Sequence, residues 1–329
     1  MADTRIGIIG GGGIAREHCR AYRAVGGARI VAVAEVDEAR GQEFAREQNC
    51  VWHSDWRALL DRPDIDAVSI CLPHSLHAAA TIDAARAGKD ILCEKPIATA
   101  LDDADAAIAA CHAAGVRLMV GHTHRFRREH IVALELLRSG AIGQVHQVRD
   151  VIWAGREAIV PLGWRGVNVL NGGGVFMDNG IHAADRLIWW VGARPTWVAA
   201  RMSRATTIVE GEDLGVALIG FANGVTATLE QSFAVPRDAG QCDATFVGSE
   251  GVLRVETWRG LGYARIGEAW KAIALPEGGL NGFDAEIAEF LSAIREKRAP
   301  SVTGEDGRAA LELIQAIYRS ARSGTSIDL

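Results

Sequence analysis

The chain has 329 residues, about twice the length of a typical domain, and this length predicts two domains. Hydrophobic residues make up 49% of it and charged residues 23%, which excludes a disordered or fibrous protein. A formal net charge of -6, and apolar runs well short of the ~20 residues of a membrane span, argue against nucleic-acid and membrane partners.

The cysteines and the N-terminal segment indicate the compartment. The six cysteines are scattered without a CxxC pair, which favours reduced thiols over a disulfide framework or a zinc ribbon. Gly7 interrupts the first apolar run, so this segment lacks the apolar core of a secretion signal. We therefore expect a cytoplasmic protein.

The first part of the chain alternates between apolar runs and alanine-rich stretches. The runs, typical of buried parallel strands, lie at residues 5–9, 29–34, 67–72, 91–93 and 117–120. The stretches between them, typical of helices, lie at residues 14–25, 38–48, 78–87 and 103–114. This order predicts an α/β Rossmann domain over residues 1–122, with a doubly wound parallel sheet covered on both faces.

The pattern changes after residue 122. Helices are expected at residues 129–138 and 175–190, and a strand at residues 144–153. Alternating Thr- and Val-rich strands follow at residues 216–221, 225–231, 244–248 and 252–257, before closing helices at 283–296 and 305–320. Residues 123–329 are therefore expected to form an α+β domain with a large, mainly antiparallel sheet that binds substrate and forms oligomers. Its C-terminal helix is a candidate to pack back on the first domain.

A glycine-rich loop follows the first strand. Gly10-Gly11-Gly12-Gly13-Ile14-Ala15 matches the G-x-G-x-x-A pattern of dinucleotide-binding loops, and Glu35 ends the second strand about 20 residues later. A carboxylate there binds the ribose hydroxyls and repels a 2′-phosphate, which favours NAD over NADP. The alternatives are a plain glycine turn and, for the acid, Asp37, which could equally be the N-cap of the next helix. The predicted cofactor contacts are Gly10, Gly12, Gly13, Ile14, Ala15 and Glu35.

Glu94-Lys95-Pro96 lies where a parallel strand ends, the edge at which doubly wound sheets bind ligands. A lysine fixed there could donate to a substrate oxygen and stabilise its negative charge. The alternative is an ion pair at a surface turn.

Asp178, His182 and Asp185 follow the triplet Gly172-Gly173-Gly174 and are spaced to share one face of a helix. An imidazole oriented by a carboxylate is a general acid/base near neutral pH. The alternative is a capping aspartate beside a buried histidine without a chemical role.

Together these motifs resemble the Gfo/Idh/MocA family of nicotinamide-dependent oxidoreductases over nearly the whole chain. The residues that carry the resemblance are Gly10 to Ala15, Glu35, Pro73 to His77, Gly88 to Pro96, Gly172 to Asp185 and Val302 to Ala310.

The resemblance implies hydride transfer between the nicotinamide and a hydroxyl-bearing carbon of a sugar, cyclitol or related polyol or dihydrodiol. Lys95 would hold the reacting oxygen, His182 would carry its proton, and Asp178 would bind substrate or orient the pair. The cofactor contacts implied in addition are Pro73, His74, His77, Glu94 and Lys95.

Some positions depart from the family pattern and bear on the substrate. His122 and His124 flank Thr123 where many relatives have Asn, and if extended, both would point one way, with His124 a candidate substrate contact. A metal site there is disfavoured because a third ligand is missing. His74 also stands where Asn is common. Trp164 and Arg165 resemble positions that border the substrate. Arg156 and Arg165 could favour a carboxylated substrate, and the alternative is that both are solvated loop arginines.

Two other function classes remain open from the sequence. A glycosidase of the same fold could retain NAD and oxidise its substrate only transiently, and a sensor could bind the dinucleotide without catalysis. The outer face of the second sheet is expected to be apolar, which predicts a homodimer or homotetramer built through that sheet.

Overall fold

The computed structural model describes residues 3–155 and 163–329. The chain divides into two compact units, which are described here one at a time. Unit 1 comprises the residues up to Thr123 together with Leu280–Arg308. Unit 2 comprises His124–Gly279 together with Ala309–Leu329. Arg156 lies outside the described residues.

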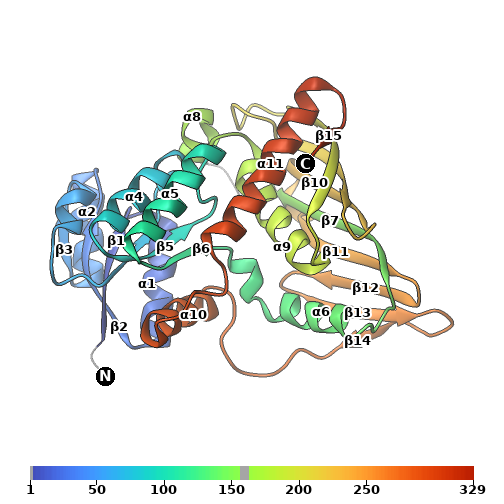
Figure 1. The fold of residues 1–329 in the computed structure, drawn as a ribbon, viewed down its shortest axis with the longest axis horizontal. Helices are drawn as coiled ribbons and strands as arrows, with labels where there is room; N and C mark the ends of the chain where they lie inside the picture. Colours follow the sequence, from blue (N-terminus) through green and yellow to red (C-terminus); the bar gives the residue numbers. More distant parts are fainter. Residues whose placement is uncertain (1–2, 156–162) are drawn as a thin grey trace. The chain divides into compact units, whose positions relative to one another are not determined.

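Unit 1 contains a six-stranded parallel sheet in the order β3-β2-β1-β4-β5-β6 (Figure 1). Its strands are β1 (Thr4–Ile9), β2 (Ala28–Ala34), β3 (Val51–His53), β4 (Ala67–Ile70), β5 (Asp90–Glu94) and β6 (Leu118–Gly121). The strand order reverses between β1 and β4, and this reversal is where such sheets bind dinucleotides. The predicted doubly wound fold is confirmed.

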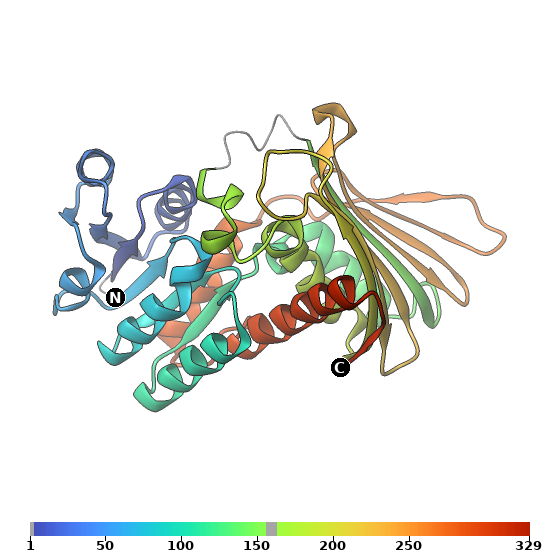
Figure 2. The same ribbon diagram turned by 90° about the horizontal axis from the view of Figure 1, so that it is seen from above.

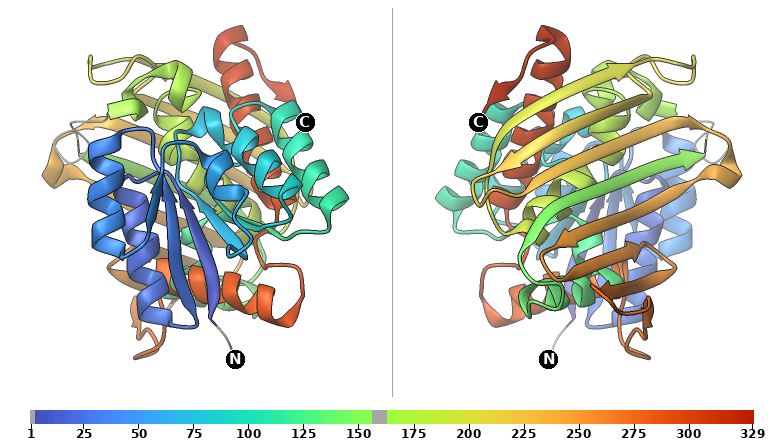
Figure 3. Two further views of the ribbon diagram at one scale, coloured as in Figure 1. Left: turned by 90° about the vertical axis from the view of Figure 1, so that its left-hand side faces the viewer. Right: turned by 90° about the vertical axis from the view of Figure 1, so that its right-hand side faces the viewer.

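Helices flank this sheet on both faces, with α1 on one side and α4 and α5 on the other (Figure 3, left). They are α1 (Gly13–Val25), α2 (Glu38–Gln48), α3 (Trp56–Leu60), α4 (His77–Arg86) and α5 (Leu101–Ala114). One further helix, α10 (Phe283–Glu296), comes from the far end of the sequence and packs against α1. Unit 1 is therefore completed by a segment that the predicted boundary at residue 122 assigns to the second domain.

Unit 2 contains a nine-stranded sheet in the order β14-β13-β12-β11-β7-β10-β9-β8-β15 (Figure 3, right). The strands are β7 (Val145–Gly155), β8 (Pro195–Ser203), β9 (Leu214–Phe221), β10 (Thr226–Val235), β11 (Gln241–Gly248), β12 (Gly251–Glu256), β13 (Gly260–Arg265), β14 (Lys271–Ile273) and β15 (Ile327–Asp328). All neighbours are antiparallel except β7 and β10, which are parallel. The mainly antiparallel sheet expected from the sequence is confirmed.

Helices cover one face of this sheet, and the other face carries exposed side chains. α9 (Ile181–Val191) packs on β7, and α6 (Arg128–Arg138) packs on β12 and β13. Seen from above, these helices lie along the same side of the sheet (Figure 2). On β9, Ala217 and Ile219 are buried while Val216 and Leu218 are 49% and 39% exposed. The outer face therefore carries exposed aliphatic side chains. α8 (Asn168–Asn171) and α11 (Gly304–Ser323) complete the helices, with α11 shared between the two units.

The helix expected at residues 175–190 has a different start. Its first turn, Phe176–Gly180, is a π-helix, and the α-helix begins at Ile181. The Glu212 carboxylate accepts hydrogen bonds from the backbone N–H groups of Gly174 and Phe176, and these contacts hold the chain where it enters the wide turn. A π-turn changes the angular spacing of the residues along the helix, so Asp178 and His182 do not have the α-helical relationship that we expected.

Within the described part of the chain, every helix is too short or too polar to cross a lipid bilayer.

Candidate functional site

The glycine loop of unit 1 leaves room for a ligand next to its backbone. Gly10 has a φ of 97°, and a Cβ there would overlap the backbone carbonyl of Cys71, so only glycine fits. A Cβ at Gly12 or Gly13, in contrast, would meet no protein atom within 4 Å. Ala15 is fully buried, as close packing of α1 on the sheet requires.

The N-terminus of α1 has the properties of a phosphate site. No side chain caps it, because the N-cap residue is Gly12. Its first N–H groups have no partner within the helix and face the same side as the positive end of the helix dipole. Backbone donors beside two glycines with open space fit a dinucleotide pyrophosphate.

Glu35, at the end of β2, is tied to this loop. Its carboxylate accepts hydrogen bonds from the backbone N–H groups of Gly11 at 2.9 Å and Asp37 at 3.0 Å, and from the Arg40 guanidinium at 2.6 Å. Burial would raise the pKa of Glu35, but these hydrogen bonds outweigh it and hold the pKa below its usual value. Asp37 instead accepts from the backbone N–H of Arg40 and is the N-cap of α2. Of the two acids, Glu35 is therefore the one held next to the glycine loop.

The Glu94-Lys95-Pro96 corner lies at the end of β5, where Glu94 forms a buried pair with a histidine. Glu94 lies 2.9 Å from Nε2 of His18 on α1, and its other oxygen accepts the backbone N–H of Lys95 at 3.2 Å. Burial would raise the pKa of Glu94, but the hydrogen bond and charge of His18 outweigh it and lower the pKa. Lys95 is itself buried, and the Lys95-Pro96 peptide bond is cis.

Glu286 of α10 joins this pair. Ligand-type atoms of His18, Glu94 and Glu286 all lie within 4.8 Å of one another, and the three side chains are buried. Burial, and after it the charge of Glu94, raise the pKa of Glu286 well above its usual value. A neutral carboxyl group beside a carboxylate explains how two acids share this space, so the cluster supports the Lys95 corner without requiring a metal.

The Pro73-His74-Ser75-Leu76-His77 segment lies at the end of β4, next to this corner. His77 is fully buried, with Nδ1 at 2.6 Å from the carbonyl of Pro96 and Nε2 at 2.8 Å from that of Leu72. Its ring therefore connects the two loops that follow β4 and β5. His74 is buried, and Pro73 precedes the 3-10 turn His74–Leu76.

In unit 2, Asp178 lies in the π-turn and His182 in the first turn of α9. Asp178 is buried, and one of its oxygens lies 3.6 Å from Nε of Arg165. The Arg165 guanidinium also lies over the ring of Trp164. The structure thus brings the expected Trp164-Arg165 pair to Asp178.

The glycine triplet before this turn serves packing. A Cβ at Gly173 would overlap the Tyr318 hydroxyl, and one at Gly174 would overlap the backbone of Glu212. Tyr318 donates a hydrogen bond to Glu212 at 2.7 Å. This buried pair places the segment that carries Asp178.

Asp185, three positions after His182 on α9, forms an ion pair with Arg125. Its carboxylate receives two nitrogens of the buried Arg125 guanidinium, at 2.6 to 3.1 Å. Both carboxylate oxygens of Asp185 accept from Arg125, which comes from a segment 60 residues earlier. A role of Asp185 toward His182 stays a prediction.

His122 and His124 do not lie on an extended segment. Residues Thr123–Phe126 form a 3-10 turn, so the extended segment on which a common direction of the two imidazoles depends is not present. His122 is fully buried in unit 1, whereas His124 belongs to unit 2 and stacks on His182 with ring centroids 4.5 Å apart.

A cavity of about 660 Å³ in unit 2 lies beside this histidine pair. Its lining includes both histidines, Asn179, the aromatic Trp153 and Trp258, and several charged residues from β11 and β12. Its size falls in the ~300–1,000 Å³ range of small-molecule sites. A polar cavity with aromatic walls and two imidazoles suits a hydroxyl-rich ligand.

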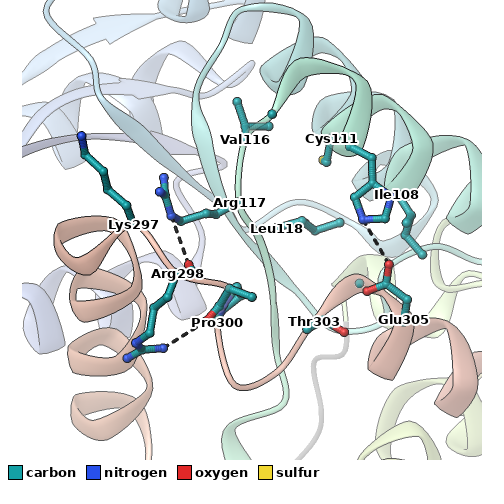
Figure 4. A pocket seen from close by; sticks show the side chains of 14 residues that line it. Ile108, Cys111, Val116, Arg117, Leu118, Lys297, Arg298, Pro300, Thr303 and Glu305 are labelled. Atoms are coloured by element: carbon teal, nitrogen blue, oxygen red, sulfur yellow. Dashed lines mark hydrogen bonds and ion pairs between the residues drawn. The ribbon is translucent and has the colours of Figure 1, made fainter.

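Unit 1 has a second, smaller pocket, with a volume of about 300 Å³, between α5 and the loop that follows α10 (Figure 4). Its charged side chains include Arg117, Lys297 and Arg298, and Arg117 donates to the carbonyl of Arg298. The glycine loop, Glu35 and Lys95 are not among its lining residues, so it is separate from the candidate site.

Sequence reasoning missed the buried polar residues behind the cavity. Arg186 and Asp150 form a fully buried ion pair, and His130 and Thr257 join the same network. One signal in the sequence points to Arg186, because this charged residue directly precedes the apolar run at residues 187–191. Nothing local to the sequence indicates its partner Asp150.

Comparison with known proteins places the chain in a family. An oxidoreductase family model with an NAD-binding Rossmann fold matches residues 4–122, and the α/β C-terminal domain model of the same family matches residues 134–329. The 1,5-anhydro-D-fructose reductase of Ensifer adhaerens is 32% identical over 99% of this chain and 98% of its own length. The myo-inositol 2-dehydrogenase of Thermotoga maritima is 28% identical over 99% of this chain and 98% of its own length.

A solved structure of levoglucosan dehydrogenase, in complex with NADH and levoglucosan, has a TM-score of 0.90 and 27% identity, covering 99% of each chain. The resemblance found in the sequence and the expected NAD-binding domain are confirmed. The chain therefore belongs to the Gfo/Idh/MocA family of oxidoreductases, and its N-terminal part is that family's NAD-binding Rossmann domain.

Proposed function

We propose that this protein is a dehydrogenase that transfers hydride between NAD and a hydroxyl-bearing carbon of a sugar, a cyclitol or a related polyol or dihydrodiol. The observation that carries the proposal is the polar cavity of unit 2, lined by His124 and His182, in a chain that also has the NAD-binding domain. The related reductase and inositol dehydrogenase act on small polyhydroxylated compounds, which supports the substrate class.

The cofactor is bound by the chain's own backbone and one acid. Gly12, Gly13 and the N-terminus of α1 bind the pyrophosphate, with Gly10, Ile14 and Ala15 shaping the loop. Glu35 binds the adenosine ribose hydroxyls, and its negative charge disfavours the 2′-phosphate of NADP. Pro73, His74 and His77, which follow β4, and Glu94, which ends β5, complete the cofactor site.

When bound, the nicotinamide supplies the hydride acceptor or donor. Lys95 donates a hydrogen bond to the reacting oxygen and stabilises the negative charge that develops on it. His182 accepts the hydroxyl proton during oxidation and returns it during reduction. Asp178 binds substrate or orients His182, while His124, Trp164 and Arg165 contact the rest of the substrate.

A spectrophotometric screen tests this assignment. Purified protein is incubated with NAD and a panel of sugars, cyclitols, polyols and dihydrodiols, and NADH formation is followed by its near-ultraviolet absorbance. Oxidation of at least one compound supports the proposal. Glycoside cleavage that requires bound NAD without net NADH would instead identify a hydrolase, and NAD binding with neither reaction would identify a dinucleotide-binding sensor.

We also propose that the protein forms a homodimer or homotetramer through the outer face of the nine-stranded sheet. The exposed Val216 and Leu218 of β9 support this, because aliphatic side chains on an uncovered sheet face are typical of subunit interfaces.

A further inference from the structure

Arg186 of α9 occupies the centre of a buried polar network in unit 2. Its guanidinium donates to both oxygens of Asp150, at 2.7 and 2.6 Å, and both side chains are fully buried. Burial alone would lower the pKa of Arg186, but Asp150 outweighs it and raises the pKa. Arg186 is therefore a permanent cation with only hydrogen-bond donors to offer.

The permanent charge of Arg186 determines which nitrogen of the neighbouring His124 ring carries the proton. Nη1 of Arg186 lies 3.2 Å from Nδ1 of His124. Because a guanidinium cannot accept a hydrogen bond, Nδ1 of His124 must be the acceptor and must carry no proton. The single proton of a neutral His124 ring is then on Nε2.

The hydrogen bonds of His130 and Thr257, which belong to the same network, also have defined donors and acceptors. Nδ1 of His130 lies 2.8 Å from the backbone carbonyl of His124, so this nitrogen donates. Burial, and after it the charge of Arg186, lower the pKa of His130 well below its usual value, so the ring is neutral. Its Nε2 then accepts, and the Thr257 hydroxyl, 2.9 Å away, donates to it. The Thr257 oxygen in turn lies 3.4 Å from Nη1 of Arg186 and accepts from it. Arg186 thus fixes Nδ1 of His124 as an acceptor, while the His124 carbonyl fixes the roles of the His130 ring.

The environment of His124 keeps its ring neutral. Burial, and after it the neighbouring His182 and Arg186, lower the pKa of His124 well below its usual value. His124 lines the 660 Å³ cavity, and among the described residues its Nε2 has no hydrogen-bond partner. The ring therefore presents an N–H donor at the cavity while it stacks on His182.

We infer that Arg186 is a positioning residue that holds His124 as the neutral Nε2–H tautomer, and that His124 thereby binds a hydrogen-bond acceptor oxygen of the substrate. The tautomer follows from the contacts of Arg186 alone, whereas the substrate contact rests on the proposed function. A substrate is accordingly required to present a hydroxyl, carbonyl or carboxylate oxygen to this ring. His182, which stacks on a neutral partner, is left as the proton carrier.

Nitrogen-15 NMR of histidine-labelled protein without substrate tests the tautomer directly. The His124 signals are assigned by their loss in His124→Gln. We expect a non-protonated Nδ1 and a protonated Nε2 throughout the neutral pH range. A protonated Nδ1, or a ring that carries both protons near neutral pH, overturns the inference whether or not the protein oxidises polyols.

A double variant tests the role of Arg186. Arg186→Met with Asp150→Leu removes both buried charges together, which leaves no uncompensated ion in the core. We expect the His124 signals to change to a mixture of both neutral tautomers. Retention of the wild-type tautomer in the folded double variant overturns the assignment to Arg186.

The matched control is the other buried Arg–Asp pair of α9. Arg125→Met with Asp185→Leu removes a comparable bidentate pair whose guanidinium contacts Asp185 and lies over Trp189. We expect similar destabilisation but unchanged His124 signals. An equal change of tautomer in this control means that any loosening of the helix moves the ring, and this contradicts a specific role for Arg186.

Kinetics with an oxidised substrate test the binding role. Loss of one neutral hydrogen bond predicts that the Arg186→Met, Asp150→Leu variant raises KM about three- to tenfold while kcat changes by less than about twofold. A loss confined to kcat contradicts a binding role for His124, although it leaves the polyol oxidation of the wild type intact.

Discussion

The carboxylate of Glu35 accepts a hydrogen bond from the backbone N–H of Gly11, with 2.9 Å between the nitrogen and the oxygen. The acid that ends β2 is thereby attached to the loop between β1 and α1, although the two residues are 24 positions apart. The glycine loop and Glu35 are thus held together, and a change in either is expected to act on the same ligand.

Glu35→Ala is expected to weaken NAD binding at least about tenfold, because charge-assisted hydrogen bonds to the ribose are lost. The substitution also leaves the Arg40 guanidinium next to the ribose 2′ position, so the affinity for NADP should rise relative to that for NAD. Titration with each dinucleotide measures both effects. Asp37→Ala is the control. It removes the N-cap of α2 and should lower thermal stability while the preference for NAD over NADP stays unchanged. An unchanged preference in Glu35→Ala contradicts the role of Glu35.

Alanine substitutions at two glycines of the loop are expected to have different effects, one on NAD binding and the other on stability. An added Cβ at Gly12 meets no protein atom, so Gly12→Ala should keep the wild-type Tm while NAD binding weakens about tenfold or more. Gly10 has a positive φ and no space next to Cys71, so Gly10→Ala should lower the stability by about 2 kcal/mol or more. Calorimetry and NAD titration of both variants separate the effects. Wild-type NAD affinity in Gly12→Ala would exclude the loop as the pyrophosphate site.

Glu286 is expected to make stability fall as pH rises. Its pKa is raised in the folded state, so the folded protein holds a proton that the unfolded chain has released above the ordinary carboxyl pKa. The stabilising proton is retained at low pH and lost as pH increases toward the raised pKa. Glu286→Gln mimics the neutral acid and should raise the Tm at about pH 8 by about 2–4 °C, with little change near pH 5.

Glu289 on the same helix is the control for this measurement. It forms an ion pair with Arg298, whose hydrogen bond lowers the pKa of the Glu289 carboxyl. Glu289→Gln should therefore lower the Tm at about pH 8, in the opposite direction. A lower Tm in both variants at that pH would mean that Glu286 is ionised in the folded protein.

The outer face of the sheet is expected to hold subunits together. Val216→Lys with Leu218→Lys places two charges among the exposed aliphatic side chains of β9, which should reduce the mass seen by light scattering to that of the monomer. Ile131→Lys changes a similarly exposed aliphatic residue on α6 and should leave the mass unchanged. A monomeric wild-type protein at micromolar concentration would contradict the proposed interface.

The sequence predicts most of the elements because their ends carry local signals. α2 begins after the capping Asp37 and ends at Asn49 in the left-handed conformation, and its bounds agree with the prediction. β3 and α3 were missed because they have only three and five residues, too few to show a period. The parallel pairing of β7 with β10 depends on long-range contacts, and no local pattern encodes it.

The same distinction holds for the site. The glycine loop and Glu35 are recognisable from spacing, because the chemistry is concentrated in a short βαβ segment. The pairing of Asp185 with Arg125 and of Arg186 with Asp150 arises only when distant segments pack, so the sequence predicts neither pair. The cytoplasmic location stays a prediction from the sequence.

The central claim is that Lys95 and His182 perform the chemistry, while the glycine loop and Glu35 supply most of the NAD affinity. The most direct test measures NADH formation by wild-type protein, Lys95→Met and His182→Ala with a substrate identified in the screen, together with NAD affinity by titration. Loss of a proton carrier or of the group that stabilises the oxygen predicts a decrease in kcat of about 100-fold or more in each variant, with NAD affinity within about threefold of wild type. Wild-type turnover in either variant would contradict the assignment.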